Sequence, residues 1–576
     1  MHSEDGYMKR LKAFIVSIGL AIFLLSHPSY SLPPKPHLCQ NAATIYVNAT
    51  FITLNPKQPE VSAVAVGRHR LLALGDKANL MRACQGKDTQ VIDLKGAYVV
   101  PGFIDTYSKF LLYGWLSENA LDVSTTNALK QSDWQEIKSL NTFLAALKHK
   151  APNADGWVIV NGYDPLRMQG ESLNQTMLTN LQPTIPTLVL YASGAQALVN
   201  QAAMQKITAF NHEKNMVIDN HGFIRNTSLM KVFGHLINKE EASKAIQQAA
   251  RQYTQQGYTT ATETMLNPAW IADYEQLTLS PNFPLDVVLL PSTITEKQRM
   301  DLTYQDFFRL YAGPVLFKVD GSAQDGAAFL TTPSSLQTNR LHSGNSWPDT
   351  LKKSPRELEQ FLEAADKEKV PVALECNGDA AIDLALNLIN KVQNTPSEGS
   401  LNAIIINAPF VRNDQLQRLQ HLKVKVSWFV PHFYYWGTAF CSFFRDAQGN
   451  YQTTPLVSAK KIMTSLSAHA NPPAAPPAPL HLIAMMNSGE LPNWPPGNAR
   501  CVSIKPAKAS LKFIDALKAL TLDAAVLYGL ENNKGSLVPG KLADMTLLSA
   551  NPLKTDIRTI KVLGTISRGV LRLNNE

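Results

Sequence analysis

The sequence has little cysteine and lacks the cysteine spacing of a thiolate metal site. Its 576 residues include 5 cysteines, and none belongs to a Cys-x-x-Cys pair. A zinc knuckle built from thiolates needs such close pairs, so that kind of site is disfavoured. In an oxidising compartment disulfides could form instead. Cys39 and Cys84 flank a short β-rich segment, and Cys441 and Cys501 flank a long insertion. We predict these two pairs and a free Cys376.

Dense runs of basic residues are missing too. Charged residues make up 17% of the chain, and Lys and Arg are scattered although the formal net charge is +8. A nucleic-acid site would combine basic runs with interleaved aromatic side chains, which this sequence does not have. We therefore expect no nucleic-acid partner. The Gly-x-Ser-x-Gly motif of a nucleophilic serine is also absent.

One long apolar run, AFIVSIGLAIFLLS at 13–26, follows the basic residues at 8–12. This pattern is typical of a signal peptide, because the run is short for a membrane span. Ser29 and Ser31 are suitable small residues for cleavage after Ser31. An uncleaved anchor is the alternative, and translation could start at Met1 or at Met8. The mature protein is therefore expected to be exported, periplasmic or secreted, with no stable membrane insertion.

The length suits a large α/β barrel with a smaller second domain. Short β-like segments stand at both ends: TIYVNATFITL, VSAVAVGRHRLLALG and QVIDLKGAYVV before residue 100, and GSLVPGKLADMTLLS and IKVLGTISRGVLRL near the end. Between them, apolar runs such as WVIVNGY, PTLVLYA, VLFKVDG, VPVALECNG, AIIINAP and VKVSWFV alternate with helical stretches such as PRELEQFLEAADKEK and AAIDLALNLINKVQ. Repeated strand-then-helix units predict a parallel barrel with its site at the C-terminal strand ends.

We divide the chain accordingly into four parts. They are a signal peptide at 1–31, the N-terminal part of a small β-sandwich at 40–100, a TIM-type (β/α)8 barrel at 101–510, and a C-terminal helix with the rest of the sandwich at 511–576. The proline-rich NPPAAPPAP at 471–479 is expected to be a loop.

Seven motifs follow one another along the chain, and their order and spacing are informative. They are VIDLKGAYVVPGFID, GWVIVNGYDP, GYTTATETM, FKVDGSAQDGAAFL, VALECNGDAAIDLAL, VSWFVPHFYYWG and ALTLDAAVLYGLENNKGSLVPGKLADMTLL. Together they resemble the amidohydrolase superfamily, in the amidohydrolase-3 branch of metal-dependent hydrolases. The resemblance covers nearly the whole mature chain. It implies a (β/α)8 barrel with one or two divalent metals, a β-sandwich from both ends, and hydrolysis of C–N bonds other than peptide bonds.

The resemblance also implies metal ligands at particular positions. After Asp105 the family has His-x-His, where this chain has Tyr107 and Lys109. Lys318 matches the family's lysine, which is often carboxylated to bridge two metals. Glu375 stands at the next histidine position.

Further along, the substitutions continue. Asn407 stands at the following histidine position, and His469 replaces the aspartate that ligates metal and acts as general base. Ser467 occupies the preceding histidine position. A substrate-side Gly-His reads Gly194-Ala195. Among these positions only Lys318 keeps the family's residue.

These residues do not make the ordinary binuclear centre, because zinc needs about three protein ligands and a lysine cation repels a metal. In one interpretation Lys109 and Lys318 both pair with Glu375 in place of the metals. In the other, Glu375, His469 and His432 hold one zinc or manganese ion. Cys376 is expected to face away from Glu375, since neighbouring strand residues point to opposite faces.

Two functions remain open on this basis. The first is a non-catalytic or ligand-binding relative with a degenerate metal site, and the second is a divergent amide hydrolase using one metal or none. The candidate catalytic residues are His469 and Lys318. The candidate substrate-binding residues are Tyr107, His432, Tyr434, Tyr435 and Trp436, most of them in the aromatic run FYYWG. The expected partner is a small molecule, and a homodimer is left open.

Overall fold

The computed structural model describes residues 39, 42–132, 134, 136–211, 216–264, 267–300, 309–332, 351–395, 401–443, 453–488 and 510–574. The leader predicted at 1–31 lies outside these residues. Cys501 also lies outside them, and with it the predicted Cys441–Cys501 pair. No helix in the described ranges has both the length and the apolar character needed to cross a membrane.

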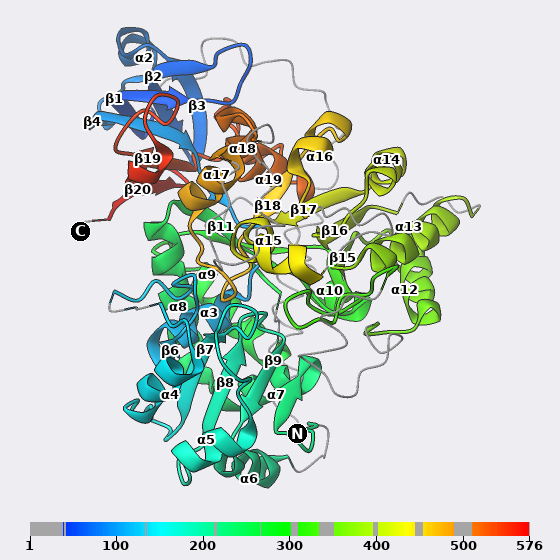
Figure 1. Cartoon of the computed structure of the whole chain (residues 1–576). Coiled ribbons are helices and arrows are strands. Elements are labelled where there is room, and N and C mark those ends of the chain that lie inside the picture. The colour runs from blue at the N-terminus through cyan, green and yellow to red at the C-terminus, as the bar shows by residue number, and fades with distance from the viewer. Residues whose placement is uncertain are drawn as a thin grey trace, which may run out of the picture.

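Strands from both ends of the chain belong to one seven-stranded sheet, shown in blue and red in Figure 1. From edge to edge it contains β21 (Val570–Leu573), β20 (Val562–Ser567), β19 (Met545–Leu548), β4 (Gln90–Pro101), β1 (Thr44–Ile52), β2 (Glu60–Gly67) and β3 (Arg70–Gly75). β4 pairs in parallel with β1 and antiparallel with β19. The Tyr46 hydroxyl donates to the carbonyl of Gly569, 523 residues away in the chain.

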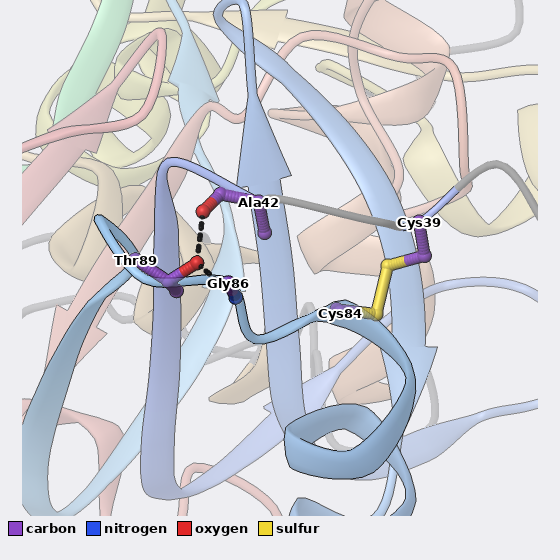
Figure 2. The surroundings of a disulfide bond; sticks show 5 residues. All are labelled: Cys39, Ala42, Cys84, Gly86 and Thr89. Carbon is purple, nitrogen blue, oxygen red and sulfur yellow. Dashed lines mark hydrogen bonds between the residues drawn. A yellow bond between two sulfur atoms is a disulfide. The ribbon is translucent and has the colours of Figure 1, made fainter.

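A disulfide between Cys39 and Cys84 ties the segment before β1 to the end of α2 (Lys77–Cys84), as Figure 2 shows. Beside it, the Thr89 hydroxyl donates to the carbonyl of Ala42 at 2.6 Å. Cys376 is a buried free thiol within the largest apolar core. The predicted Cys39–Cys84 pair and the predicted free Cys376 are confirmed.

Two parallel sheets form the middle of the molecule. One contains β13 (Leu310–Ala312), β12 (Asp286–Leu289), β11 (Tyr258–Glu263) and β5 (Phe103–Ile104), and the other contains β14 (Val315–Lys318), β15 (Val372–Cys376), β16 (Ala403–Asn407), β17 (Lys425–Phe429) and β18 (Ser467–His469). In the second sheet Lys318 is paired with Glu375, and both stand at or near the C-terminal ends of their strands. The apolar runs predicted as strands around 315, 372, 403 and 425 are confirmed.

Helices connect these strands, as the alternating pattern predicts. They are α3 (Phe110–Asn119), α8 (Lys239–Gln255), α9 (Ile271–Thr278), α10 (Ile294–Met300), α12 (Pro355–Lys367), α13 (Asp379–Gln393), α14 (Asn413–His421), α15 (Pro431–Phe443), α16 (Leu456–Ile462), α17 (Pro479–Ser488), α18 (Phe513–Ala519) and α19 (Leu522–Leu527). α12 begins with a capping box, in which Ser354 and Glu357 satisfy each other's backbone N–H groups. The proline-rich segment before α17 is a loop, as predicted.

A third sheet lies at the opposite end of the molecule from the seven-stranded sheet (Figure 1). It contains β10 (Phe223–Arg225), β9 (Gln196–Val199), β8 (Thr187–Tyr191), β7 (Val158–Tyr163) and β6 (Ala120–Asp122). Its helices are α4 (Leu140–Lys148), α5 (Gln175–Leu181), α6 (Gln201–Phe210) and α7 (Asn226–Leu236). The loop between β8 and β9 extends toward the parallel sheets and carries Gly194.

Hydrogen bonds link the two parallel sheets at two places. The Thr106 hydroxyl, just after β5, lies 2.7 Å from the Ser427 hydroxyl on β17 and 3.3 Å from the carbonyl oxygen of Ala468 on β18. On the other side, the Leu316 amide donates to the carbonyl of Pro291, just after β12, at 2.8 Å. These contacts place β5 beside β18 and β14 beside the end of β12. The molecule therefore has an α/β fold whose parallel strands converge on one region.

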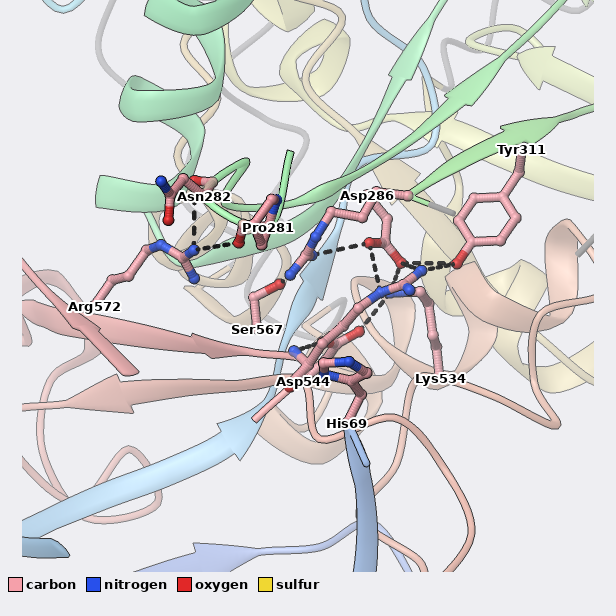
Figure 3. A network of polar contacts seen from close by, with 11 residues as sticks. His69, Pro281, Asn282, Asp286, Tyr311, Lys534, Asp544, Ser567 and Arg572 are labelled. Carbon is pink, nitrogen blue, oxygen red and sulfur yellow. Dashed lines mark hydrogen bonds and ion pairs between the residues drawn. The ribbon is translucent and has the colours of Figure 1, made fainter. Parts of the chain in front are cut away.

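A buried ionic network joins the parallel strands to the seven-stranded sheet (Figure 3). Asp286, at the start of β12, is fully buried. Its carboxylate pairs with Lys534 at 2.7 Å, Arg568 at 3.1 Å and Arg309 at 3.2 Å, and accepts from the Tyr311 hydroxyl at 2.9 Å. These cations hold the pKa of Asp286 well below its usual value although burial opposes them.

Candidate functional site

The C-terminal ends of the parallel strands surround a small polar cavity. It is lined by Lys109, Ser193, Gly194, Ala195, Asn226, Lys318, Asp320, Gly321, Ser322, Gln324, Lys352, Glu375, Asn377, Asn407, Phe429, His432 and Asn471. Such a position is where a parallel α/β fold places its functional residues. Three predicted site residues, Lys318, Glu375 and His432, therefore meet in one cavity.

Glu375 lines this cavity and is held by the phenol of Tyr107, which is not itself among the lining residues. The Tyr107 hydroxyl donates to Glu375 Oε2 at 2.6 Å, and Asn407 Nδ2 lies 3.4 Å from Oε1. Burial and the neighbouring Glu375 charge raise the pKa of Tyr107 well above its usual value, so the phenol stays protonated and acts as a donor. Lys318 Nζ lies 3.8 Å from Oε2, which is an ion pair without a hydrogen bond.

Lys109, which directly precedes α3, is a nearly buried cation with 6% of its surface exposed. Its amine donates to Asn471 Oδ1 at 3.2 Å. Burial, with help from the nearby Lys318 charge, lowers the pKa of Lys109 to about 8, which leaves it mostly protonated at neutral pH. The prediction that Lys109 and Lys318 both pair with Glu375 is therefore correct only for Lys318. Lys109 reaches an amide oxygen of the loop after β18 instead.

His469 ends β18 and is fully buried behind Asn407. Its Nε2 lies 3.1 Å from Asn407 Oδ1, and its Nδ1 lies 2.8 Å from the Ser427 hydroxyl. Because an amide oxygen only accepts, Nε2 carries the proton and Nδ1 accepts from Ser427. Burial lowers the pKa of His469 well below its usual value, so the ring is neutral. Both ring nitrogens are thus engaged with protein groups.

His432 lies at the start of α15 and is also buried. Its Nε2 donates to Gln324 Oε1 at 3.2 Å, since this oxygen can only accept. Burial lowers the pKa of His432 to about 3. The ring packs edge-on against Phe429, with ring centroids 4.4 Å apart. His432 therefore forms part of the cavity wall as a neutral side chain.

The three aromatic residues after Phe433 lie behind this wall, and none of them lines the cavity. Trp436 is buried and donates from Nε1 to Asp164 Oδ2 at 2.7 Å. The Tyr435 hydroxyl lies 3.1 Å from His481 Nε2, and the Tyr434 ring packs against both Tyr435 and His481. These side chains pack around α15 and do not contact the cavity.

Acidic residues in the motifs are held by the protein itself. Asp320 accepts three backbone N–H groups at 2.7 to 2.9 Å, and burial raises its pKa to about 7. Asp325 accepts from Gln196 at 3.0 Å, and Glu263 accepts from the Tyr274 hydroxyl at 2.6 Å. These contacts tie all three carboxylates to neighbouring groups of the protein.

Several cavity residues are missed by sequence reasoning. Lys352, Ser193 and Asn226 come from loops and a helix start that belong to no recognisable strand-end pattern. Asn471 could have been found, because it follows the last strand of the parallel series by two residues. Lys352 and Ser193 lie in loops, and no pattern in the sequence marks them as cavity residues.

Within the described ranges, no three His, Cys, Asp or Glu side chains gather in a way that could hold a metal ion. Glu375 and His432 share the cavity lining, whereas His469 is separated from it by Asn407. The polar groups available at the cavity are therefore ammonium, amide, hydroxyl and carboxylate groups and the neutral imidazole of His432.

Comparison with known proteins gives a consistent family match. The model of the amidohydrolase family Amidohydro_3 matches residues 90–572. The chain is 24% identical to Protein LONG AFTER FAR-RED 3 of Arabidopsis thaliana, covering 93% of this chain and 95% of that protein. It is 20% identical to the N-substituted formamide deformylase of Arthrobacter pascens, covering 91% of this chain and 97% of the enzyme.

Solved structures match the fold over a similar extent. An uncharacterized metal-dependent hydrolase from Pyrococcus horikoshii aligns with a TM-score of 0.69 at 20% identity, covering 90% of this chain and 99% of that one. A corresponding protein from Pyrococcus furiosus aligns with a TM-score of 0.65 at 21% identity, covering 89% and 100%. At this identity the likeness concerns the fold alone.

Proposed function

Because this chain belongs to the amidohydrolase family, we propose that it is a member in which side-chain contacts replace the metal centre and the cavity binds a small molecule. The observation that carries the proposal is that residues at the family's ligand positions form hydrogen bonds with other protein side chains. Tyr107 holds Glu375 at 2.6 Å, and His469 is held by Asn407 at 3.1 Å and Ser427 at 2.8 Å. The chain keeps the family's fold and a cavity, while these side chains form hydrogen bonds within the protein.

The donor set does not fit the family's metal. A catalytic zinc site uses about three nitrogen, sulfur or carboxylate ligands and one open position. Lys109 puts an ammonium where the family has a histidine, and Tyr107 is a protonated phenol. The Nδ1 lone pair of His469 accepts from Ser427. Glu375 is the one cavity-lining carboxylate at a family ligand position, so we derive no catalytic step through a metal.

We further propose the finer architecture that the sequence predicts. The contacts of Thr106 with β17 and β18, and of Leu316 with Pro291, support closure of the two parallel sheets into one barrel. For the end domain, the Leu71 amide on β3 donates to the carbonyl of Lys541 just before β19, which supports a sandwich folded from the seven-stranded sheet. Domain limits near 101 and 510 accord with both.

Export is also part of the proposal. The basic and apolar pattern of residues 8–26 supports a signal peptide. The Cys39–Cys84 disulfide supports an oxidising destination, since such bonds are rare in reducing compartments. A periplasmic or secreted location accounts for both observations.

A divergent amide hydrolase remains the second candidate. It is favoured by similarity along 91% of the chain to a relative named N-substituted formamide deformylase. In that case Glu375 and the nearby Lys318 would be the groups closest to a bound amide. This candidate requires a metal ion or a base that activates water. The hydrogen bonds of Glu375 and His469 described above already occupy the side chains that would supply either one.

Elemental analysis of the mature protein distinguishes the two. The protein would be purified without chelators and analysed before and after incubation with zinc or manganese. We expect less than about one-tenth of a metal ion per chain, since the donor set offers few ligands. Assays with N-formyl and simple amide substrates should show no turnover above that of a Glu375→Ala variant.

About one tightly held metal per chain, lost in both the Glu375→Ala and His469→Ala variants, would overturn the proposal in favour of the hydrolase. A matched control is His221→Ala, because His221 is an exposed histidine away from the cavity. Metal that is also lost in this control would indicate surface binding and would leave the proposal standing.

A further inference from the structure

Three lysine side chains line the cavity and come from distant parts of the chain. Lys109 precedes α3, Lys318 ends β14, and Lys352 precedes α12. Two carboxylates, Asp320 and Glu375, line the same cavity. The formal charge of the lining is therefore 3 − 2 = +1.

Neutral groups of the protein already hold the two carboxylates. Asp320 accepts three backbone N–H groups at 2.7 to 2.9 Å. Glu375 accepts from the Tyr107 hydroxyl at 2.6 Å and from Asn407 Nδ2 at 3.4 Å. A carboxylate has about four lone-pair positions, so these donors take much of the capacity that the lysines could otherwise use.

The lysines, in contrast, use few of their donors. An ammonium group carries three N–H donors. Lys109 spends one on Asn471 Oδ1 at 3.2 Å, and Lys318 Nζ is 3.8 Å from Glu375 Oε2, too far for a hydrogen bond. In the part of the chain that the structure describes, Lys352 Nζ has no hydrogen-bond acceptor or ion-pair partner. Lys109 is buried, and a buried ammonium with unused donors is costly unless something else pairs with it, whereas the Lys318 side chain is 43% exposed.

We propose that this cavity binds the anionic group of a small molecule, a carboxylate or a phosphate, through Lys109, Lys318 and Lys352. The inference rests on the proposed small-molecule-binding function and specifies its ligand class. Lys109 is the deepest of the three contacts, with 6% of its surface exposed, and charge-assisted hydrogen bonds are strongest where water is excluded. Gly194 lies beside it, and a Cβ there would lie in van der Waals contact with Lys109 Nζ at 3.4 Å.

Calorimetric titration of the full mature chain in metal-free buffer at neutral pH tests this inference. The probes are succinate, inorganic phosphate and the uncharged succinamide. At least one anion should bind, and succinamide should not. Lys109→Met and Lys318→Met should each weaken anion binding by about tenfold or more, as expected for a hydrogen bond to a charged group. Lys353→Met should leave binding unchanged, because Lys353 is exposed and pairs with Glu357 at 3.3 Å.

Binding of succinate alone would identify a carboxylate ligand, and binding of phosphate alone would identify a phosphate ligand. Either result supports the inference when both lysine variants weaken it. Binding of neither anion, or equal binding in wild type and both variants, overturns it. Metal content and amide turnover test the proposed function separately, so a metal-dependent hydrolase would be recognised whatever the titrations give.

Discussion

At the scale of single residues, the phenol of Tyr107 has the clearest effect, because it donates a short hydrogen bond to Glu375. Tyr107 is 1% exposed, and its hydroxyl lies 2.6 Å from Oε2. The hydroxyl of Tyr107 thus supplies a hydrogen-bond donor to the neighbouring carboxylate of Glu375. A carboxylate that would otherwise need a cation is stabilised by a neutral donor.

Tyr107→Phe should lower the free energy of unfolding by about 1–3 kcal/mol, because Glu375 loses its shortest hydrogen bond while remaining largely buried. Urea unfolding measures the change. Tyr434→Phe is the matched control, since among the described residues the Tyr434 hydroxyl has no hydrogen-bond partner and its ring packs against Tyr435 and His481. Equal losses in the two variants would show that the Tyr107 hydroxyl has no special role.

The sequence predicts which residues lie at the ends of the strands, but it does not predict which side chains they contact. The positions of Lys318, Glu375 and Asn407 follow from strands that end at these residues or one residue later. The direction of Lys109 does not, since its partner Asn471 lies on a loop 362 residues away in the chain. Similarly, the residues of FYYWG look like a substrate wall, but Trp436 is drawn away from the cavity by Asp164.

At the scale of elements, the strands and helices with clear periodicity are predicted well because local pattern determines them. The run AAIDLALNLINKVQ becomes α13, and AIIINAP becomes β16, within a few residues. α3 has no such signal, because it is apolar on nearly all sides and 7 of its 10 residues are buried. Its position depends on packing against α8, which sequence alone does not reveal.

The crossing of α3 and α8 depends on Gly114, where a Cβ would lie 2.0 Å from the carbonyl oxygen of Ala245. Gly114→Ala should destabilise the protein by a net amount of about 1–2 kcal/mol. The backbone contact costs roughly 1–3 kcal/mol, and helix propensity returns only up to about 1 kcal/mol. Thermal and urea unfolding measure this.

Gly234→Ala in α7 is the matched helical control. The nearest atom to its Cβ would be Asn267 Nδ2 at 2.9 Å, at the end of a side chain that can turn aside. We expect its stability to be unchanged or raised by up to about 1 kcal/mol. Destabilisation of both variants to the same degree would contradict a tight α3–α8 crossing.

At the scale of the whole molecule, Asp286 connects the parallel strands to the C-terminal segment through Lys534 and Arg568. Its neighbours hold its folded pKa well below the unfolded value of about 3.9. The unfolded chain therefore takes up a proton first as pH falls, and the stability from this group is lost below about pH 4. Above that pH the contribution is fully present.

Asp286→Asn should cost about 3–5 kcal/mol at neutral pH, because three buried cations lose their central partner. It should also remove part of the acid-induced loss of stability seen in the wild type. Urea unfolding at neutral and acidic pH measures both effects. Asp556→Asn, in an exposed pair with Arg558, should leave stability nearly unchanged, because exposed ion pairs contribute little. Parallel acid profiles for wild type and Asp286→Asn would disprove the assigned role.

The shared sheet of the two chain ends has a consequence for the order in which the protein can be made. β4 leaves the ribosome early, yet its partner β19 is synthesised much later. At about 5–20 residues per second, the β4 edge waits roughly half a minute or more for its partner. An unpaired strand edge is prone to aggregation during that time. Chains truncated before Met545 should therefore accumulate as aggregates, because β4 then never pairs with β19.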